Sequence, residues 1–281
     1  MGTLQGSWIW YELMTPDPEG AKAFYEPIVG WSISTGHADT NDYGFLTAPD
    51  QAMVGGVLRL TQDMVQNSGR PCWLGYVGVD NVDESLTAIE AAGGTVVMPA
   101  TDVAMAGRVA MVTDPGGAAL YVMTPNPPPG GGESTAFQSD INCGHCGWNE
   151  LLAGDGPRET DFYASQFGWS LPEPMDMGAM GKYQFVAHDG VQVGAIMGKM
   201  PQMPHAMWNH YFWVASIAAA KDAIEALSSE LEHATRATNQ LLALARTDSG
   251  SLDMEVFDVH DLARDVALAM LPLARTAGID F

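Results

Sequence analysis

The chain repeats itself at a nearly constant spacing, and this repeat restricts its fold more than any other feature. Trp10 and Glu12 return 138 residues later as Trp148 and Glu150. Further members of this block are Asp17, Phe24, Tyr25, Gly30 and Trp31, which return as Asp155, Phe162, Tyr163, Gly168 and Trp169. A second block returns at a spacing of 135 residues, with Trp73, Tyr76 and Ile89 recurring as Trp208, Tyr211 and Ile224. We therefore expect two copies of one folding unit, with insertions and deletions in the loops.

Within the first copy, the hydrophobic pattern predicts a strand, a helix and three more strands, and then the same order again. Strands are expected at residues 8–14, 31–35, 43–47 and 53–58, and later at 95–98, 108–113 and 119–123. Helices are expected at 18–28, capped by Asp17, and at about 82–92, opened by Asp80 and closed by Gly93.

This duplicated β-α-β-β-β unit carries two local motifs, D-P-x-x-A-x-x-F-Y from Asp17 and G-R-x-A-x-x-x-D-P-x-G from Gly107. It resembles the vicinal oxygen chelate superfamily, which contains glyoxalase I, bleomycin-resistance proteins and extradiol dioxygenases. The opening W-x-E-L-M-T-P-D is similar to the two-domain, glyoxalase-like branch. The resemblance covers residues 8–123 completely and 148–226 in part. It implies an α+β fold of tandem domains, in which repeated modules form curved, cup-shaped sheets.

The two copies differ in completeness. We predict a complete glyoxalase-like domain at residues 1–124, a Pro/Gly-rich linker at 125–140, a partial glyoxalase-like domain at 141–226 and a helical tail at 227–281. The second copy has no counterpart of residues 93–123, so three of its strands are expected to be missing.

The tail resembles a fragment of a sensor histidine kinase, covering the second dimerisation helix and the entry to the ATP-binding domain. The segment with the phospho-accepting histidine and the nucleotide-binding motifs are not present, so kinase activity is not implied. A nearly apolar stripe runs along it at helical spacing, formed by Leu227, Leu231, Ala234, Thr238, Leu241 and Ala245. The stripe could pack on its own domain or between two chains, and we favour a homodimer; a fusion of unrelated fragments is another origin for the tail.

The charge excludes several classes of partner. Twelve Lys and Arg residues against 34 Asp and Glu give a net charge of −22, which repels nucleic acid and anionic membranes. Hydrophobic or cationic small molecules are better partners for such a chain. No stretch is apolar enough to span a membrane, the start lacks the pattern of a secretory signal, and three cysteines make no disulfide framework. We therefore expect a cytoplasmic protein.

The resemblance also says where the family places its metal ligands, which are His, Gln and Glu side chains inside the cup. In this chain, those positions hold Trp10, Leu74 and Tyr121 in the first copy and Trp148 and Asn209 in the second. These residues do not provide the imidazole and carboxylate donors that a divalent ion needs, so we expect no cofactor. The alternative, a divalent metal, would draw on three isolated histidines: His145, His205 and His210.

An aromatic cup with one carboxylate takes the place of the metal site. Strand alternation predicts that Trp8, Trp10 and Glu12 share one face, and the resemblance brings Leu74, Tyr76 and Tyr121 to it. In the second copy the corresponding residues are Trp148, Glu150, Asn209 and Tyr211. Burial would raise the pKa of Glu12 toward that of a general base, or the carboxylate could hold a cation stacked on Trp10. Alternatively, the two glutamates bond to buried groups at a domain seam, and the aromatic residues are core.

The motif Cys143-Gly144-His145-Cys146 matches the redox dithiol of thioredoxin-like proteins only locally. Such dithiols need a helix amino terminus to lower the thiol pKa, whereas this motif precedes a predicted strand. We expect an incidental pair or a weak metal-binding spot.

Three functions remain after these considerations. The first is a metal-independent small-molecule-binding protein with an acidic, aromatic cavity. The second is a superfamily enzyme, an isomerase, lyase or hydrolase, with Glu12 or Glu150 as base and Tyr76 or Tyr121 as hydrogen-bond donor. The third is an interaction module that uses the tail.

Overall fold

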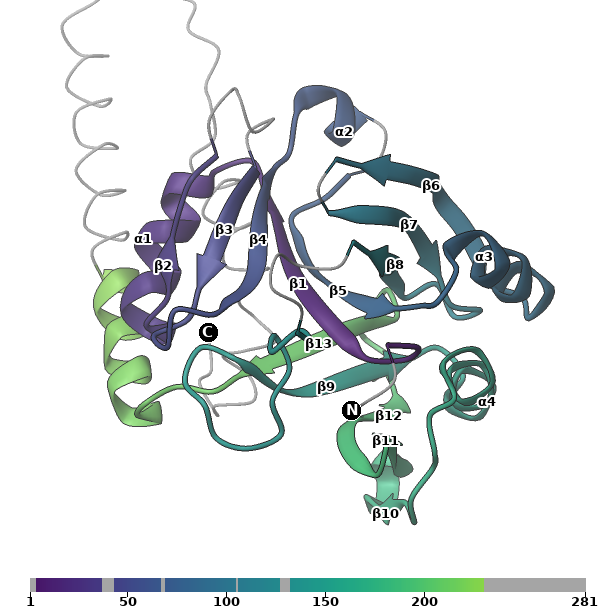
Figure 1. Cartoon of the computed structure of the whole chain (residues 1–281). Helices are drawn as coiled ribbons and strands as arrows, with labels where there is room; N and C mark the ends of the chain where they lie inside the picture. Colours follow the sequence, from purple (N-terminus) through teal and green to yellow (C-terminus); the bar gives the residue numbers. More distant parts are fainter. Residues whose placement is uncertain (1–3, 37–42, 67–68, 105, 127–131, 230–281) are drawn as a thin grey trace, which may run out of the picture. The chain divides into compact units, whose positions relative to one another are not determined.

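The computed structural model describes residues 4–36, 43–66, 69–104, 106–126 and 132–229. It confirms an α+β fold with two sheets (Figure 1). Residues 1–215 form one compact unit, and a second unit begins at residue 216. None of the helices within the described ranges is long and apolar enough to cross a membrane.

The first sheet has eight strands in the order β2-β3-β4-β1-β5-β8-β7-β6. Its strands are β1 (Trp8–Thr15), β2 (Ser32–Ile33), β3 (Tyr43–Thr47), β4 (Met53–Arg59), β5 (Cys72–Gly78), β6 (Thr95–Val103), β7 (Gly107–Thr113) and β8 (Ala119–Pro125). Its helices are α1 (Pro18–Val29), α2 (Gln62–Gln66) and α3 (Val82–Ala91). All the strands and both helices expected in the first copy are confirmed, whereas α2 was not predicted. β1 lies in the middle of the sheet, parallel to β4 and antiparallel to β5 (Figure 1).

The helix caps explain where two of these helices begin. Asp17 caps α1 as expected, because its side chain accepts from the Gly20 amide at 2.9 Å. The expected cap of α3 was wrong by one residue: Asn81, not Asp80, accepts from the Glu84 amide. Asn81 is the last extended residue before α3, which puts its side chain within reach of the first free amides.

The second sheet repeats five strands of the first in the same order, β10-β11-β12-β9-β13. Its elements are β9 (Cys146–Ala153), α4 (Gly156–Phe167), β10 (Met175–Asp176), the short 3-10 helix η2 (Gly178–Met180), β11 (Lys182–His188), β12 (Val191–Gly198) and β13 (Met207–Phe212). Among the described strands, only β9 is hydrogen-bonded to β13, so β13 is an edge strand of this sheet. Residues 217–229 are helical. The predicted tail lies outside the described residues from residue 230 on, and its resemblance to a kinase fragment stays a prediction.

The two copies pack against each other through equivalent residues. Trp31 donates its indole N–H to the Gly144 carbonyl at 2.7 Å, and Trp169 donates to the Gly6 carbonyl at 2.8 Å. Each of these residues is 138 positions from its counterpart, so the two bonds are reciprocal. Both glycines have positive φ angles, 91° at Gly6 and 86° at Gly144, which L side chains rarely adopt. The contact therefore has an approximate two-fold relation.

Two residues near this approximate axis contact their own counterparts. The Tyr11 hydroxyl donates to Asn149 Oδ1 at 3.1 Å, and a Cβ atom on Gly75 would lie 2.9 Å from Cε1 of His210. The same Cβ would also lie 2.4 Å from the ring of Trp8. In each pair, a larger residue of one copy contacts a smaller residue of the other copy. This difference in size lets the two equivalent positions pack closely.

Trp8 belongs to this interface and not to the cup, so its expected placement was wrong. The register of β1 against β5 shifts between Trp8 and Trp10, where a bulge interrupts the alternation of faces. Trp8 consequently packs on Trp169 and Trp208, with ring centroids 5.7 and 5.1 Å away.

We predict that Gly75→Ala destabilises the chain by about 1–3 kcal/mol, because the new methyl group must displace the buried rings of Trp8 and His210. The matched control is Gly198→Ala, also on a strand, where no atom lies within 4 Å of the added Cβ. It should change the free energy of unfolding by less than about 1 kcal/mol. Urea denaturation measures both, and equal stabilities for the two variants would contradict this packing.

Candidate functional site

The candidate site is the face of the first sheet that lies opposite the interface between the copies. Glu12 of β1 is 2% exposed and sits between β4 and β5. The Tyr76 hydroxyl donates to its Oε2 at 2.8 Å. Its other oxygen, Oε1, is buried and forms no hydrogen bond of ordinary geometry among the described residues, although the hydroxyls of Tyr43 and Tyr121 lie near enough to lower the pKa of the carboxyl. A buried carboxylate oxygen without a well-formed hydrogen bond is costly, so a ligand that donates to this atom would stabilise it.

Aromatic side chains surround this carboxylate. Trp10 donates its indole N–H to the Tyr43 hydroxyl at 2.9 Å. The Tyr121 ring stacks on Tyr76 with centroids 4.3 Å apart, because β8 runs parallel to β5 with these two residues as partners. The structure thus brings Trp10, Tyr76 and Tyr121 together around Glu12, as the sequence predicted. We call these residues, together with Tyr43, the copy-one cup.

The wall of the copy-one cup is apolar and rich in sulfur. Leu74, the β5 partner of Glu12, is buried in it. Half-buried side chains from five strands pack around this cluster: Leu58, Cys72, Met98, Met111 and Met123. Methionine adapts its shape to different ligands and contacts aromatic rings favourably.

Burial dominates the electrostatics of the cup. It raises the pKa of the Glu12 carboxyl above its ordinary value, while the hydroxyls of Tyr76, Tyr43 and Tyr121 act in the opposite direction. Burial also raises the pKa of the Cys72 thiol to about 11, with a further contribution from the charge of Glu12. Cys72 is therefore a neutral thiol at physiological pH.

The second copy has the same arrangement in a more open form. Trp148 donates to the Tyr183 hydroxyl at 2.9 Å, and Tyr183 donates to Glu150 Oε2 at 2.7 Å. The Tyr211 hydroxyl donates to Glu150 Oε1 at 3.0 Å. Asn209 is the β13 partner of Glu150 and is half-buried. The site residues predicted in the second copy therefore lie together.

Tyr43 and Tyr183 were not predicted as site residues. Each accepts the indole N–H of the tryptophan in its copy and lies beside the glutamate of that copy. They lie on β3 and β11, far from the other cup residues in sequence. A signal was present, because Tyr43-Gly44-Phe45 returns as Tyr183-Gln184-Phe185 at a spacing of 140 residues. A search for the repeat with a variable offset would have found both.

The donor atoms present do not fit the metal that the superfamily implies. The positions of the family's ligands hold an indole, an aliphatic side chain and a phenol, and Glu12 is the one carboxylate of the copy-one cup. Among the described residues, no three His, Cys, Asp or Glu side chains come together as a metal site.

The candidate histidines have other surroundings. Both ring nitrogens of His145 face acceptors, the Thr135 carbonyl and the Asp50 carboxylate. His210 is buried, bonds through Nδ1 to Asn149, and has a pKa lowered to about 3 by burial. His205 is exposed, in the loop before β13.

Cys146 is a poor candidate for redox chemistry. It is fully buried at the start of β9, and burial raises its thiol pKa to about 12. A reactive dithiol needs the opposite shift. Cys143 and Cys146 are both free thiols.

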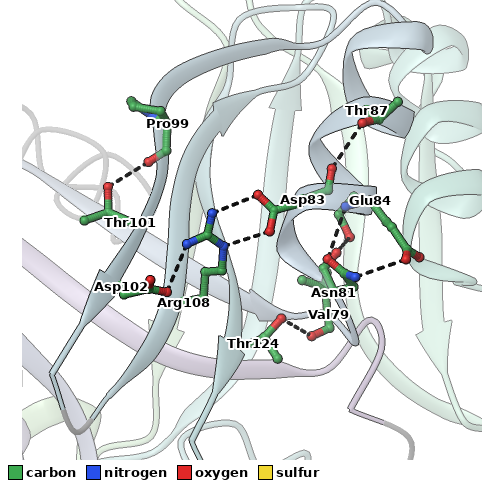
Figure 2. Close-up of polar contacts among 11 residues, drawn as sticks. Val79, Asn81, Asp83, Glu84, Thr87, Pro99, Thr101, Asp102, Arg108 and Thr124 are labelled. Atoms are coloured by element: carbon green, nitrogen blue, oxygen red, sulfur yellow. Dashed lines mark hydrogen bonds and ion pairs between the residues drawn. The ribbon is translucent and has the colours of Figure 1, made fainter.

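Arg108, from the G-R-x-A motif, is a structural residue. Its guanidinium donates twice to Asp83 of α3 and once to Asp102 of β6, at 2.8–2.9 Å (Figure 2). A surface hollow lies beside it at the ends of β6 to β8, but none of its lining residues belongs to the copy-one cup. Two carboxylates already occupy the guanidinium, so it offers little to an anionic ligand.

Comparison with known proteins gives consistent results for sequence and structure. The family model "Glyoxalase/Bleomycin resistance protein/Dioxygenase superfamily" matches residues 9–122. "Putative glyoxylase CFP32" of Mycobacterium bovis is 31% identical over 224 residues, which cover 78% of this chain and 82% of the relative. "Anthracycline biosynthesis protein DnrV" of Streptomyces peucetius is 31% identical over 196 residues, covering 66% and 68%.

Among solved structures, 2,2',3-trihydroxybiphenyl 1,2-dioxygenase from Sphingomonas wittichii strain RW1 superposes with a TM-score of 0.53 at 13% identity. The match covers 79% of this chain and 78% of the dioxygenase. At this identity, the likeness supports the tandem arrangement of the fold and nothing about its chemistry.

The raised pKa of Glu12 predicts a pH dependence of stability. The folded state holds this proton more tightly than the unfolded state, whose ordinary pKa is 4.5. Stability from this group is therefore complete below pH 4.5 and is lost as the pH rises through the folded-state pKa. The unaltered chain should therefore lose stability relative to the Glu12→Gln variant as the pH rises from 4 to 8, because glutamine does not titrate. Urea titrations measure it, and parallel pH profiles would contradict the assignment.

Proposed function

The chain belongs to the glyoxalase/bleomycin resistance/dioxygenase superfamily, and on this premise we propose that it is a small-molecule-binding protein of the glyoxalase and bleomycin-resistance type. Its ligand is a planar, hydrophobic or cationic compound, held in the copy-one cup without a metal ion. The observation that carries this proposal is the buried Oε1 of Glu12 in the aromatic cup, which forms no hydrogen bond of ordinary geometry among the described residues.

Two properties of the cup and one property of the whole chain support this ligand class. Trp10 and the methionines offer apolar contact to a flat ring system. Glu12 offers an acceptor to an N–H, O–H or ammonium group of the ligand. The net charge of −22 favours cations over anions across the whole chain.

The names of the relatives suggest a first probe. One relative is named as an anthracycline biosynthesis protein, and anthracyclines are planar, coloured and, in their glycosylated forms, cationic. Doxorubicin therefore tests the chemistry that the copy-one cup offers, whatever the natural ligand is.

We predict that Trp10→Leu weakens doxorubicin binding about tenfold or more, because the ligand loses ring contact with the indole. Isothermal titration calorimetry measures the affinity. The control is Val97→Ala, a residue of β6 that is 55% exposed and belongs to neither buried cluster. An unchanged affinity in Trp10→Leu would place the ligand elsewhere.

Metal independence needs its own test. Protein purified without an affinity metal should contain less than stoichiometric divalent metal by mass spectrometry, and should bind doxorubicin equally before and after dialysis against a chelator. A stoichiometric metal whose removal abolishes binding would overturn this part of the proposal.

A second candidate function is enzymatic, and the raised pKa of Glu12 favours it. Burial raises the pKa of this carboxyl in the direction that a general base needs, and the Tyr76 hydroxyl, which donates to it, would hold it in place. If the chain is an isomerase, lyase or hydrolase of this superfamily, the double variant Glu12→Gln, Glu150→Gln should lose about 100-fold or more in turnover. Undiminished turnover in that double variant would exclude both glutamates as the base.

A further inference from the structure

We propose that the open aromatic face of the second copy is a separate binding site for an aromatic or quaternary ammonium cation. The site consists of Trp148 and Glu150 of β9, Tyr183 and Phe185 of β11, and Tyr211 of β13, and we call it the copy-two half-cup. It does not rest on ligand binding in the copy-one cup, because its residues come from the other sheet.

The hydrogen bonds of the half-cup fix a carboxylate among aromatic rings. Glu150 accepts one tyrosine hydroxyl on each oxygen, at 2.7 and 3.0 Å. Tyr183 in turn accepts the indole N–H of Trp148. Each partner therefore restrains the next, and the acceptor is held in place before a ligand arrives.

Exposure distinguishes the half-cup from the copy-one cup. Glu12 is 2% exposed, and Tyr121 of β8 stacks on Tyr76, the residue whose hydroxyl donates to Glu12. In the second copy, the described residues contain no strand beside β13 that could supply a counterpart of Tyr121. Along β9, Trp148, Glu150 and Leu152 are accordingly half-buried, whereas the alternate residues Asn149 and Leu151 are buried.

The ring geometry suits a cation. Phe185 meets Trp148 at 75° with centroids 6.2 Å apart, and it meets Tyr183 at 81° and 5.5 Å. Rings at steep angles around one carboxylate can present π faces to a bound cation from more than one side. Quaternary ammonium ions bind in such surroundings, because the rings attract charge without requiring hydrogen bonds from the ligand.

The flanking residues add adaptability and a negative field. Met175 of β10 is the strand partner of Tyr183 and is 46% exposed, so it can fold over ligands of different size. The chain's net charge of −22 attracts cations to this open face.

The experiment uses the full chain labelled with ¹⁵N and follows the indole N–H signals of its eight tryptophans. The Trp148 signal is identified by its loss in Trp148→Phe. Titration with benzyltrimethylammonium should shift that signal saturably, while the neutral benzyl alcohol should not. The matched charge control is Glu173→Gln, an exposed carboxylate of the same copy.

Glu150→Gln should weaken benzyltrimethylammonium binding about tenfold, and Glu173→Gln should leave the affinity within about twofold. If Glu150→Gln does not fold, the unaltered chain provides the test: raising the salt concentration should weaken binding of the cation. A Trp148 signal that does not move, or that benzyl alcohol moves equally, would overturn the proposal. The proposed function is tested by the effect of Trp10→Leu on doxorubicin affinity, whereas this proposal is tested by the Trp148 signal. A negative result in one experiment is therefore distinguishable from a negative result in the other.

Discussion

The contact between the two copies is the constraint on which the rest of the structure depends. Trp31 and Trp169 each donate to a glycine carbonyl of the other copy, so neither copy satisfies these groups alone. An approximate two-fold contact also brings residues near its axis against their own counterparts. Two identical residues would often collide there, and the pairs Tyr11 with Asn149 and Gly75 with His210 avoid this by being unequal. The repeat differs at these positions because the packing requires it.

The same contact determines where the cups can be. Strand alternation sends Tyr11 toward the interface and Trp10 and Glu12 to the opposite face. In the second copy, Asn149 faces the interface, while Trp148 and Glu150 face the half-cup. The interface thus holds one side of β1 and β9 rigidly, and the other side is available for a ligand. This arrangement gives the cup residues fixed positions on strands rather than on loops.

Much of this fold could be predicted from the sequence, because the repeat and the hydrophobic periods are local signals. Strand alternation, together with the strand order of the family, was enough to predict that Glu12, Tyr76 and Tyr121 lie together. Trp8 was misplaced, since a bulge shifts the side-chain alternation by one residue and leaves no clear mark in the pattern. The reciprocal hydrogen bonds of Trp31 and Trp169 could not be predicted, because they join segments whose proximity depends on how the two sheets pack.

The two glutamates show how one motif gives two different environments. Both accept a tyrosine hydroxyl, from Tyr76 or Tyr211, and both lie near a tryptophan that is bonded to a second tyrosine. What differs is the presence of β8, whose Tyr121 covers Glu12 and helps to exclude water. Exclusion of water raises the pKa of Glu12, and one oxygen of Glu12 forms no hydrogen bond of ordinary geometry among the described residues, while Glu150 has a tyrosine on each oxygen. The closed cup therefore suits a ligand that brings its own hydrogen-bond donor. The open half-cup already satisfies its carboxylate, and it suits a ligand whose charge, rather than a hydrogen bond, provides the attraction.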